Sequence, residues 1–252
     1  PMSAIAKTTW KLDATTAFVL SMALAIVFAC MRATGTLGPP NLRFLLPLGF
    51  VVMALSPWAL LTREGRCEIG LKKSVRPAVY LHSGLAGAAA ALACFLVGLA
   101  LFGTGADNWF VTIAASFGRT VNTGLPVWQL YLMFTVTSMI FSPFGEEIFF
   151  RGMLQRALEE RFSVRTSTWL ECLAFGFVHL CHHGVVLGAS GLMLLPRSAP
   201  IWFVLMVLVA HLFAWLRKRS ESLYPAIAAH AAFNFVMGTC IFLALWPASS
   251  EL

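Results

Sequence analysis

Residues 127–151 read VWQLYLMFTVTSMIFSPFGEEIFFR, an apolar run that ends in two adjacent glutamates, with an arginine four residues after the second. The apolar part is close to the length of about 20 residues that a helix needs to cross a bilayer. If the helix continues through the glutamates, it carries ionisable side chains into the apolar layer, where they are costly and usually functional. This stretch therefore predicts a membrane-spanning helix that contains part of a polar site.

The same apolar character extends along the whole chain. Hydrophobic residues make up 59% of the 252 residues, charged residues make up only 12%, and the mean hydropathy is +0.79. A soluble domain carries about 25% charged residues. A secretory signal peptide would explain one apolar stretch near the N-terminus, but not several along the chain.

Seven apolar segments are long enough to be expected spans. They are residues 14–31, 42–61, 78–102, 127–150, 167–181, 201–216 and 223–246. Residues 185–195 are apolar but short and glycine-rich, so they predict either a re-entrant turn or the end of the fifth helix, and an eighth crossing stays open. The predicted fold is all-α, a polytopic transmembrane helix bundle of seven to eight spans.

Lysine and arginine gather in alternate loops between these segments. Residues 63–76, 156–165 and 217–219 are rich in lysine and arginine, whereas the loops between them have few. Arg32 and Arg43 are assigned to the first of these poor loops, which follows the first expected span. Cytoplasmic loops of membrane proteins carry an excess of lysine and arginine. The pattern predicts a multi-pass protein of the cell inner membrane with a cytoplasmic N-terminus, and it explains the net charge of +7 without nucleic acid as a partner.

The chain is expected to form a single integrated membrane domain with two parts. Residues 1–126 supply N-terminal transmembrane helices and an interfacial loop, and residues 127–246 supply the core that carries the polar motifs. Within residues 103–126, Trp109, Phe110 and Phe117 suggest a gate or docking surface at the membrane interface.

The two adjacent glutamates, Glu146 and Glu147, are expected to have different roles. Neighbouring residues on a helix point about 100° apart. Glu147 and Arg151 are four residues apart and share a face, so they are expected to form an ion pair. Glu146 then lies on another face. Taken alone, both carboxylates could equally mark the end of a helix at the membrane surface.

Two further groups of polar residues interrupt apolar segments. His179 and His183 are four residues apart with His182 close to their face, and His230 and Asn234 are also four apart. Each group has a plain structural explanation: histidines packed or placed at the interface in the first, and a hydrogen bond between helices in the second. Counted from the inferred cytoplasmic boundary, Glu146, His179 and His230 lie at similar depths of roughly 18, 17 and 12 Å. This favours one site buried among the fourth, fifth and last helices.

In this order, the three motifs resemble the CAAX protease and bacteriocin-processing (CPBP) family, which includes the type II CAAX prenyl endopeptidases. The resemblance covers residues 127–237 and is carried by Glu146-Glu147-x-x-x-Arg151, Phe175-x-x-x-His179 and His230-x-x-x-Asn234.

The resemblance implies an intramembrane endopeptidase of the glutamate-dependent type with no required metal or other cofactor. By position, Glu146 would activate water with help from His179, and His230 and Asn234 would stabilise the oxyanion. Glu147 and Arg151 would support the site, the arginine orienting the carboxylates. The implied partners are the lipid bilayer and a membrane-anchored protein or peptide cut near its C-terminus.

Three alternatives remain open from the sequence. Zinc could be held by Glu146, His179, His183 and His230, because it accepts imidazole and carboxylate ligands, although no His-Glu-x-x-His motif is present. A non-enzymatic immunity or scaffold protein would not need the glutamate and histidine motifs in register. A transporter would predict paired inverted halves, and the sequence has no such symmetry.

Overall fold

The structure is a computed structural model that describes residues 13–74, 76–120, 124–188 and 191–246. Its elements, in chain order, are α1 (Ala14–Leu37), η1 (Pro40–Leu42), α2 (Leu45–Leu60), α3 (Arg63–Glu68), α4 (Ala78–Phe102), α5 (Trp109–Thr120), α6 (Val127–Glu146), η2 (Glu147–Leu154), α7 (Gln155–Glu159), α8 (Val164–His179), β1 (Val185–Gly188), β2 (Gly191–Leu194), α9 (Ala199–Ser220), α10 (Tyr224–Cys240) and η3 (Ile241–Leu245). The predicted all-α polytopic bundle is confirmed.

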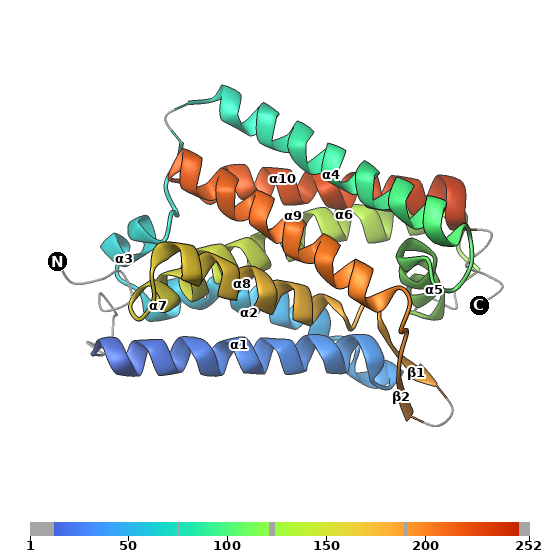
Figure 1. Cartoon of the computed structure of the whole chain (residues 1–252), viewed down its shortest axis with the longest axis horizontal. Coiled ribbons are helices and arrows are strands. Elements are labelled where there is room, and N and C mark those ends of the chain that lie inside the picture. Colours follow the sequence, from blue (N-terminus) through green and yellow to red (C-terminus); the bar gives the residue numbers. More distant parts are fainter. Residues whose placement is uncertain (1–12, 75, 121–123, 189–190, 247–252) are drawn as a thin grey trace.

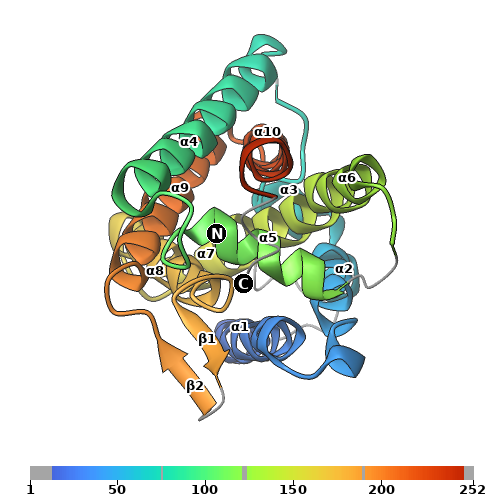
Figure 2. The ribbon, with the colours of Figure 1, turned by 90° about the vertical axis from the view of Figure 1, so that its right-hand side faces the viewer.

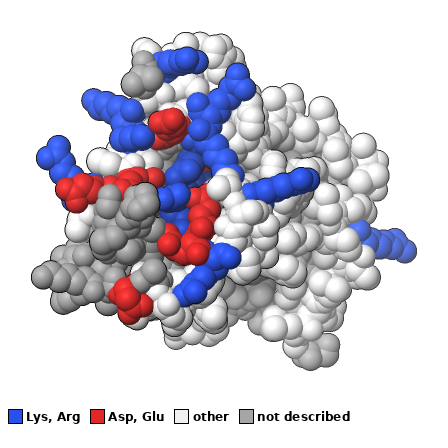
Figure 3. Space-filling model, turned by 60° about the vertical axis from the view of Figure 1, so that its left-hand side comes forward, with Lys and Arg blue, Asp and Glu red and all other residues white. Residues whose placement is uncertain are grey.

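The long helices run back and forth along one axis of the molecule (Figure 1). The segments rich in lysine and arginine, residues 63–76, 156–165 and 217–219, meet at the left of that view, and we call this the basic end. Figure 3 shows lysine, arginine and acidic side chains gathered there, beside a largely uncharged surface. Helix α5 and the β1–β2 hairpin lie at the opposite end, where α5 crosses the ends of the long helices (Figure 2).

Six helical segments of the described chain are long and apolar enough to cross a membrane. The fifth predicted span, residues 167–181, falls in α8, which has only 16 residues. Residues 185–195 are not the end of the fifth helix: this segment is an antiparallel hairpin in which Val185 pairs with Leu194. Gly184, between α8 and β1, has φ +113°, and Gly191, the first residue of β2, has φ +110°. Residues other than glycine rarely adopt these conformations, and the one at Gly184 ends the helical path before the hairpin.

The helix that begins at Val127 continues through the two glutamates, as predicted. It remains helical from Val127 to Glu159, 33 residues in all. Pro143 lacks an amide hydrogen, which removes one backbone hydrogen bond just before the chain widens into a π-helix at η2. Widened helical turns of this kind are frequent at functional sites. Here the turn carries Glu147 and Arg151 into the interior of the bundle.

Helix α1 is longer than its apolar run suggests. It begins after Asp13, whose carboxylate accepts hydrogen bonds from the amides of Thr15 (2.9 Å) and Thr16 (3.0 Å), and it ends at Leu37. The assignment of Arg32 to a loop is therefore wrong. The helix carries Arg32 past the end of the apolar run, with its side chain buried inside the bundle.

Close helix packing fixes the position of α10. A Cβ atom at Gly87 of α4 would collide with the backbone of Ala229, and one at Gly238 would collide with the side chain of Thr135 on α6. Small residues at such contacts let membrane helices approach closely. Because α10 is held against both α4 and α6, the residues on its inner face cannot move far from α6.

Trp109 and Phe110 do not form the exposed docking surface that was expected within residues 103–126. Trp109 and Phe110 at the start of α5 are fully buried, and they belong to a hydrophobic cluster with Trp202 and Phe213 of α9. The Trp109 indole stacks on Trp202, with ring centroids 5.7 Å apart, and donates a hydrogen bond to the Cys94 carbonyl. These aromatic side chains close one end of the core, so they do not form a docking face.

Candidate active site

Glu146 is the centre of a buried polar cluster. Its side chain is fully buried, and its Oε1 accepts hydrogen bonds from the Arg32 guanidinium at 2.6 Å and from the Ser142 hydroxyl at 3.0 Å. Its Oε2 lies 3.6 Å from Nε2 of His179 and is buried without a hydrogen-bond partner among the described residues. One oxygen of the carboxylate is thus held in place, while the other keeps its lone pairs.

His179 is held with one nitrogen facing this oxygen. Its Nδ1 lies 2.7 Å from the Phe175 carbonyl, which can only accept, so Nδ1 must carry the hydrogen. In the neutral ring, Nε2 then has a lone pair, and the Arg32 guanidinium donates to it at 3.1 Å. Arg32 also donates to Nε2 of His182 at 2.9 Å. A single guanidinium therefore orients the carboxylate and two imidazoles.

His230 approaches the same cluster from α10. Its Nδ1 lies 2.7 Å from a carboxylate oxygen of Glu147, and its Nε2 lies 3.5 Å from the Ser142 hydroxyl. The hydrogen bond to Glu147 fixes the ring and directs Nε2 toward the side of Ser142 and Glu146. The two adjacent glutamates thus contact different partners, as the sequence indicated.

Arg151 is buried between acidic and aromatic side chains. Its Nε lies 3.2 Å from Glu147, the ion pair that the spacing predicted, and 3.5 Å from Glu171. The guanidinium carbon lies 4.0 Å from the centre of the Phe175 ring and 5.5 Å from that of Phe213. A flat cation suits such a place because it binds carboxylates with its edge and aromatic rings with its face.

Asn234 lies one helical turn beyond His230 and is tied to α6. Its amide nitrogen donates to the Ser138 carbonyl at 2.9 Å. An amide nitrogen carries two hydrogens, so one remains for a second acceptor. Ser138 of α6 therefore faces Asn234 of α10 and Ser142 faces His230, in opposite sequence order, as expected for two antiparallel helices.

Five of the six predicted site residues form two linked groups, and the sixth, Asn234, lies one helical turn beyond His230. Glu146 and His179 form one, Glu147, Arg151 and His230 form the other, and Ser142 bridges them. Three participants were missed: Arg32, Glu171 and Ser142. Two of them could have been found from the sequence: Glu171 is a lone acidic residue within the fifth expected span, and Ser142 lies four residues before Glu146, on the same helix face. For Arg32 the only signal was its place beside an apolar run.

The zinc ligand set suggested by the sequence does not converge. His183 is directed away from Glu146 and contacts Thr112 at 2.6 Å and Ser198 at 2.8 Å, and Ser198 donates to Asp107 at 3.1 Å. No group of three or more histidine, cysteine, aspartate or glutamate side chains within the described ranges is arranged to hold a metal ion. His183 instead holds the hairpin end of the bundle to α5.

His183 makes the stability of the fold depend on pH. Burial lowers the pKa of His183 to about 4, a shift that the Asp107 carboxylate partly opposes. An unfolded histidine takes up a proton near pH 6.5, so stability falls as the pH drops from about 6.5 to 4 and is unaffected above that window. At pH 5 we expect a loss of about 2 kcal/mol, measured by thermal unfolding in detergent. His183→Gln should reduce this pH dependence and His82→Gln, on the exposed face of α4, should not; equal dependence in both variants would contradict the assignment.

Arg32 should stabilise the fold through Glu146. Removing one partner of a buried ion pair leaves an uncompensated charge and costs about 3–5 kcal/mol. We expect Arg32→Met to lower the free energy of unfolding by about 3 kcal/mol, and by less than half as much when Glu146→Gln is already present. Thermal unfolding of the four proteins measures this coupling, with Arg63→Met as an exposed control. The same cost in both backgrounds would show that the pair is not coupled.

Membrane-length helices that enclose a buried cluster of arginine, glutamate and histidine side chains define an integral membrane protein with an enzyme-like polar site. Residues 127–236 match the family model described as type II CAAX prenyl endopeptidase Rce1-like. Residues 127–236 therefore carry an Rce1-like domain, which confirms the predicted relationship for that part of the chain and supports a CAAX-type membrane endopeptidase in general. Comparisons with curated proteins and with solved structures gave no match.

Proposed function

We propose that this protein is a glutamate-dependent intramembrane endopeptidase that hydrolyses a peptide bond near the C-terminus of a membrane-associated protein or peptide. The observation that carries the proposal is the unpartnered Oε2 of Glu146, held 3.6 Å from Nε2 of His179. Because these two atoms are so close, a water molecule that binds Oε2 of Glu146 would also lie within reach of Nε2 of His179.

In the first step, Glu146 removes a proton from this water as its oxygen bonds to the carbonyl carbon of the substrate. The carbonyl π electrons move to oxygen and give a tetrahedral oxyanion. General-base assistance of this kind contributes about 10²–10⁴-fold to rate. Because Arg32 and Ser142 both bind the other oxygen of the carboxylate, Oε2 stays fixed toward the water.

In the second step, the C–N bond breaks and the nitrogen takes the proton that Glu146 and His179 hold. The products are a carboxylic acid and an amine, and a proton then passes from the acid to the amine to give a carboxylate and an ammonium group. The oxyanion of the intermediate is stabilised from α10 by the second amide hydrogen of Asn234 and by the His230 ring, which Glu147 holds in place.

Glu147 and Arg151 act through these groups. Glu147 holds the His230 ring, and Arg151 lies between the carboxylates of Glu147 and Glu171 and attracts both. No water or substrate needs to reach these three charged side chains. Their contribution is to keep the imidazole in one orientation.

The proposed orientation has the N-terminus and the basic end in the cytoplasm, with the cell inner membrane as the location. Support comes from the concentration of arginine and lysine at that end (Figure 3). Cys67 is exposed near the basic end, so a membrane-impermeant thiol reagent should label it only in opened cells. Labelling of Cys67 in intact cells would contradict the proposed orientation and indicate that the basic end faces outward.

The test of the proposed function compares protein fragments in membranes of cells that make the chain or its Glu146→Gln variant. We expect a set of shortened C-termini in membrane-associated proteins that only the active chain produces. Identical fragments in both cells would favour the non-enzymatic alternative. With a substrate identified in this way, activity of the purified protein that is abolished by a chelator and restored by zinc would favour the zinc alternative.

A further inference from the structure

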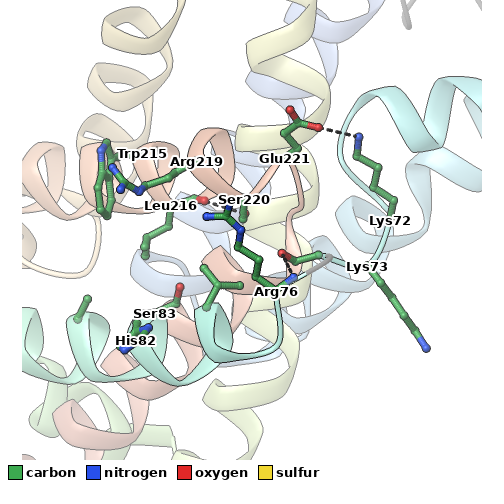
Figure 4. A pocket seen from close by; sticks show the side chains of 13 residues that line it. Lys72, Lys73, Arg76, His82, Ser83, Trp215, Leu216, Arg219, Ser220 and Glu221 are labelled. Carbon is green, nitrogen blue, oxygen red and sulfur yellow. Dashed lines mark hydrogen bonds and ion pairs between the residues drawn. The ribbon is translucent and has the colours of Figure 1, made fainter.

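A cleft of about 640 Å³ lies at the basic end, outside the Glu146 cluster. It is formed by the loop before α4, the first turns of α4 and the last turns of α9 (Figure 4). Val79, Ala86 and Leu216 supply apolar wall, and Arg76 and Arg219 supply charge. Nothing in the proposed reaction uses this cleft.

The two arginines are not neutralised by neighbours. Neither Arg76 nor Arg219 forms an ion pair with any carboxylate in the described part of the chain, whereas Lys72 is paired with Glu221 at 3.4 Å. Figure 4 shows the Arg76 side chain reaching from the start of α4 toward Ser220 of α9, while Lys73 points away. The Arg219 guanidinium lies over the Trp215 ring, 5.3 Å from its centre. The cleft therefore offers two guanidinium groups to an anion.

A buried hydroxyl in the cleft wall also lacks a partner. Ser83 of α4 is fully buried, and its oxygen makes no hydrogen bond to any described residue. In Figure 4 this hydroxyl points from α4 toward α9. A buried polar group without a partner is uncommon and calls for a ligand or an ordered water. Ser83 is an observation independent of the arginine charges.

The helices on both sides of the cleft face the bilayer. Helices α4 and α9 are both candidate membrane spans, and Leu81 and Leu85 beside the cleft expose large apolar side chains. A ligand that enters from the membrane can thus keep its chains in lipid while its head lies between the arginines. Free phosphate would satisfy the charges but would leave the apolar wall uncovered.

We propose that this cleft binds an anionic phospholipid of the leaflet at the basic end. Its phosphate lies between Arg76 and Arg219, since the planar guanidinium binds phosphate oxygens in pairs. A hydroxyl or ester oxygen of the lipid head reaches Ser83, and the first acyl carbons cover Val79 and Leu216. Trp215 and Arg219 then mark the level of the headgroups, where tryptophan is commonly found.

The test counts lipids retained by the intact chain. The protein is placed in nanodiscs of equal parts phosphatidylglycerol and phosphatidylcholine, released into mild detergent and analysed by native mass spectrometry. We expect phosphatidylglycerol to be retained in preference. Each arginine in contact with the anionic headgroup contributes a factor of about five, so Arg76→Gln with Arg219→Gln should reduce its retention about 25-fold.

The matched control is Arg63→Gln with Arg165→Gln, which removes two exposed charges of the same end outside the cleft. It should retain phosphatidylglycerol within about twofold of the unchanged chain. Equal loss in both double variants, or equal retention of phosphatidylcholine by the unchanged chain, overturns the proposal. Displacement of the lipid by millimolar inorganic phosphate or by a peptide with a free C-terminal carboxylate would identify another occupant and overturn it too. None of these results depends on peptidase activity.

Discussion

Glu146→Gln is expected to lower kcat/KM for peptide hydrolysis by about 10⁴-fold, with little change in KM. Glutamine has nearly the same shape, and its carbonyl oxygen can still accept the hydrogen bonds that Arg32 and Ser142 donate. It cannot take a proton from water. The substitution therefore removes the base while it preserves most of the surrounding geometry.

The measurement is a steady-state assay of purified protein in bilayers, beside Glu64→Gln as an exposed control on α3. Glu146→Asp keeps the charge but moves it back by one carbon, so its activity should lie between those of Glu146→Gln and the unchanged protein. Thermal unfolding checks that each variant is folded. A folded Glu146→Gln protein with more than about a tenth of normal kcat would refute the role of Glu146 as base.

Asn234→Ala should lower kcat by about 10²–10³-fold, the usual effect of losing one oxyanion donor. The amide already donates one hydrogen to the Ser138 carbonyl, which fixes where the second one points. Alanine removes both hydrogens. Because the oxyanion exists only in the transition state and intermediate, KM should change little.

The control is Thr239→Ala on the same helix, whose hydroxyl bonds the Phe235 carbonyl and lies near Tyr131. It should retain nearly full kcat. If Asn234→Ala raises KM and leaves kcat unchanged, Asn234 binds substrate and does not stabilise the oxyanion.

The sequence predicted most of the bundle because the bilayer imposes a length and an apolar composition on each spanning helix. It also predicted that Glu147 and Arg151 pair, since four residues on one helix determine that contact. Contacts between helices distant in the chain have no such rule. Arg32 meets Glu146 across 114 positions, and its own neighbours in sequence contain no trace of that partner.

The errors have a related cause. Hydropathy locates a helix by its apolar residues, so α1 was expected to stop at Met31, although the helix continues with Arg32 turned inward. Aromatic residues between two spans suggested an interface at Trp109 and Phe110. In the structure the same residues fill the end of the core, because apolar surface can be buried in protein as well as in lipid.

Arg32 also has a consequence for how the protein is made. A chain is synthesised from its N-terminus, so α1 enters the membrane long before Glu146 and His179 exist to receive its arginine. Until then the cation must extend toward the headgroups or draw in water. The site is complete only when α10, the last long helix, has been inserted with His230 and Asn234. A nascent chain in which α10 has not yet been inserted therefore lacks a complete site.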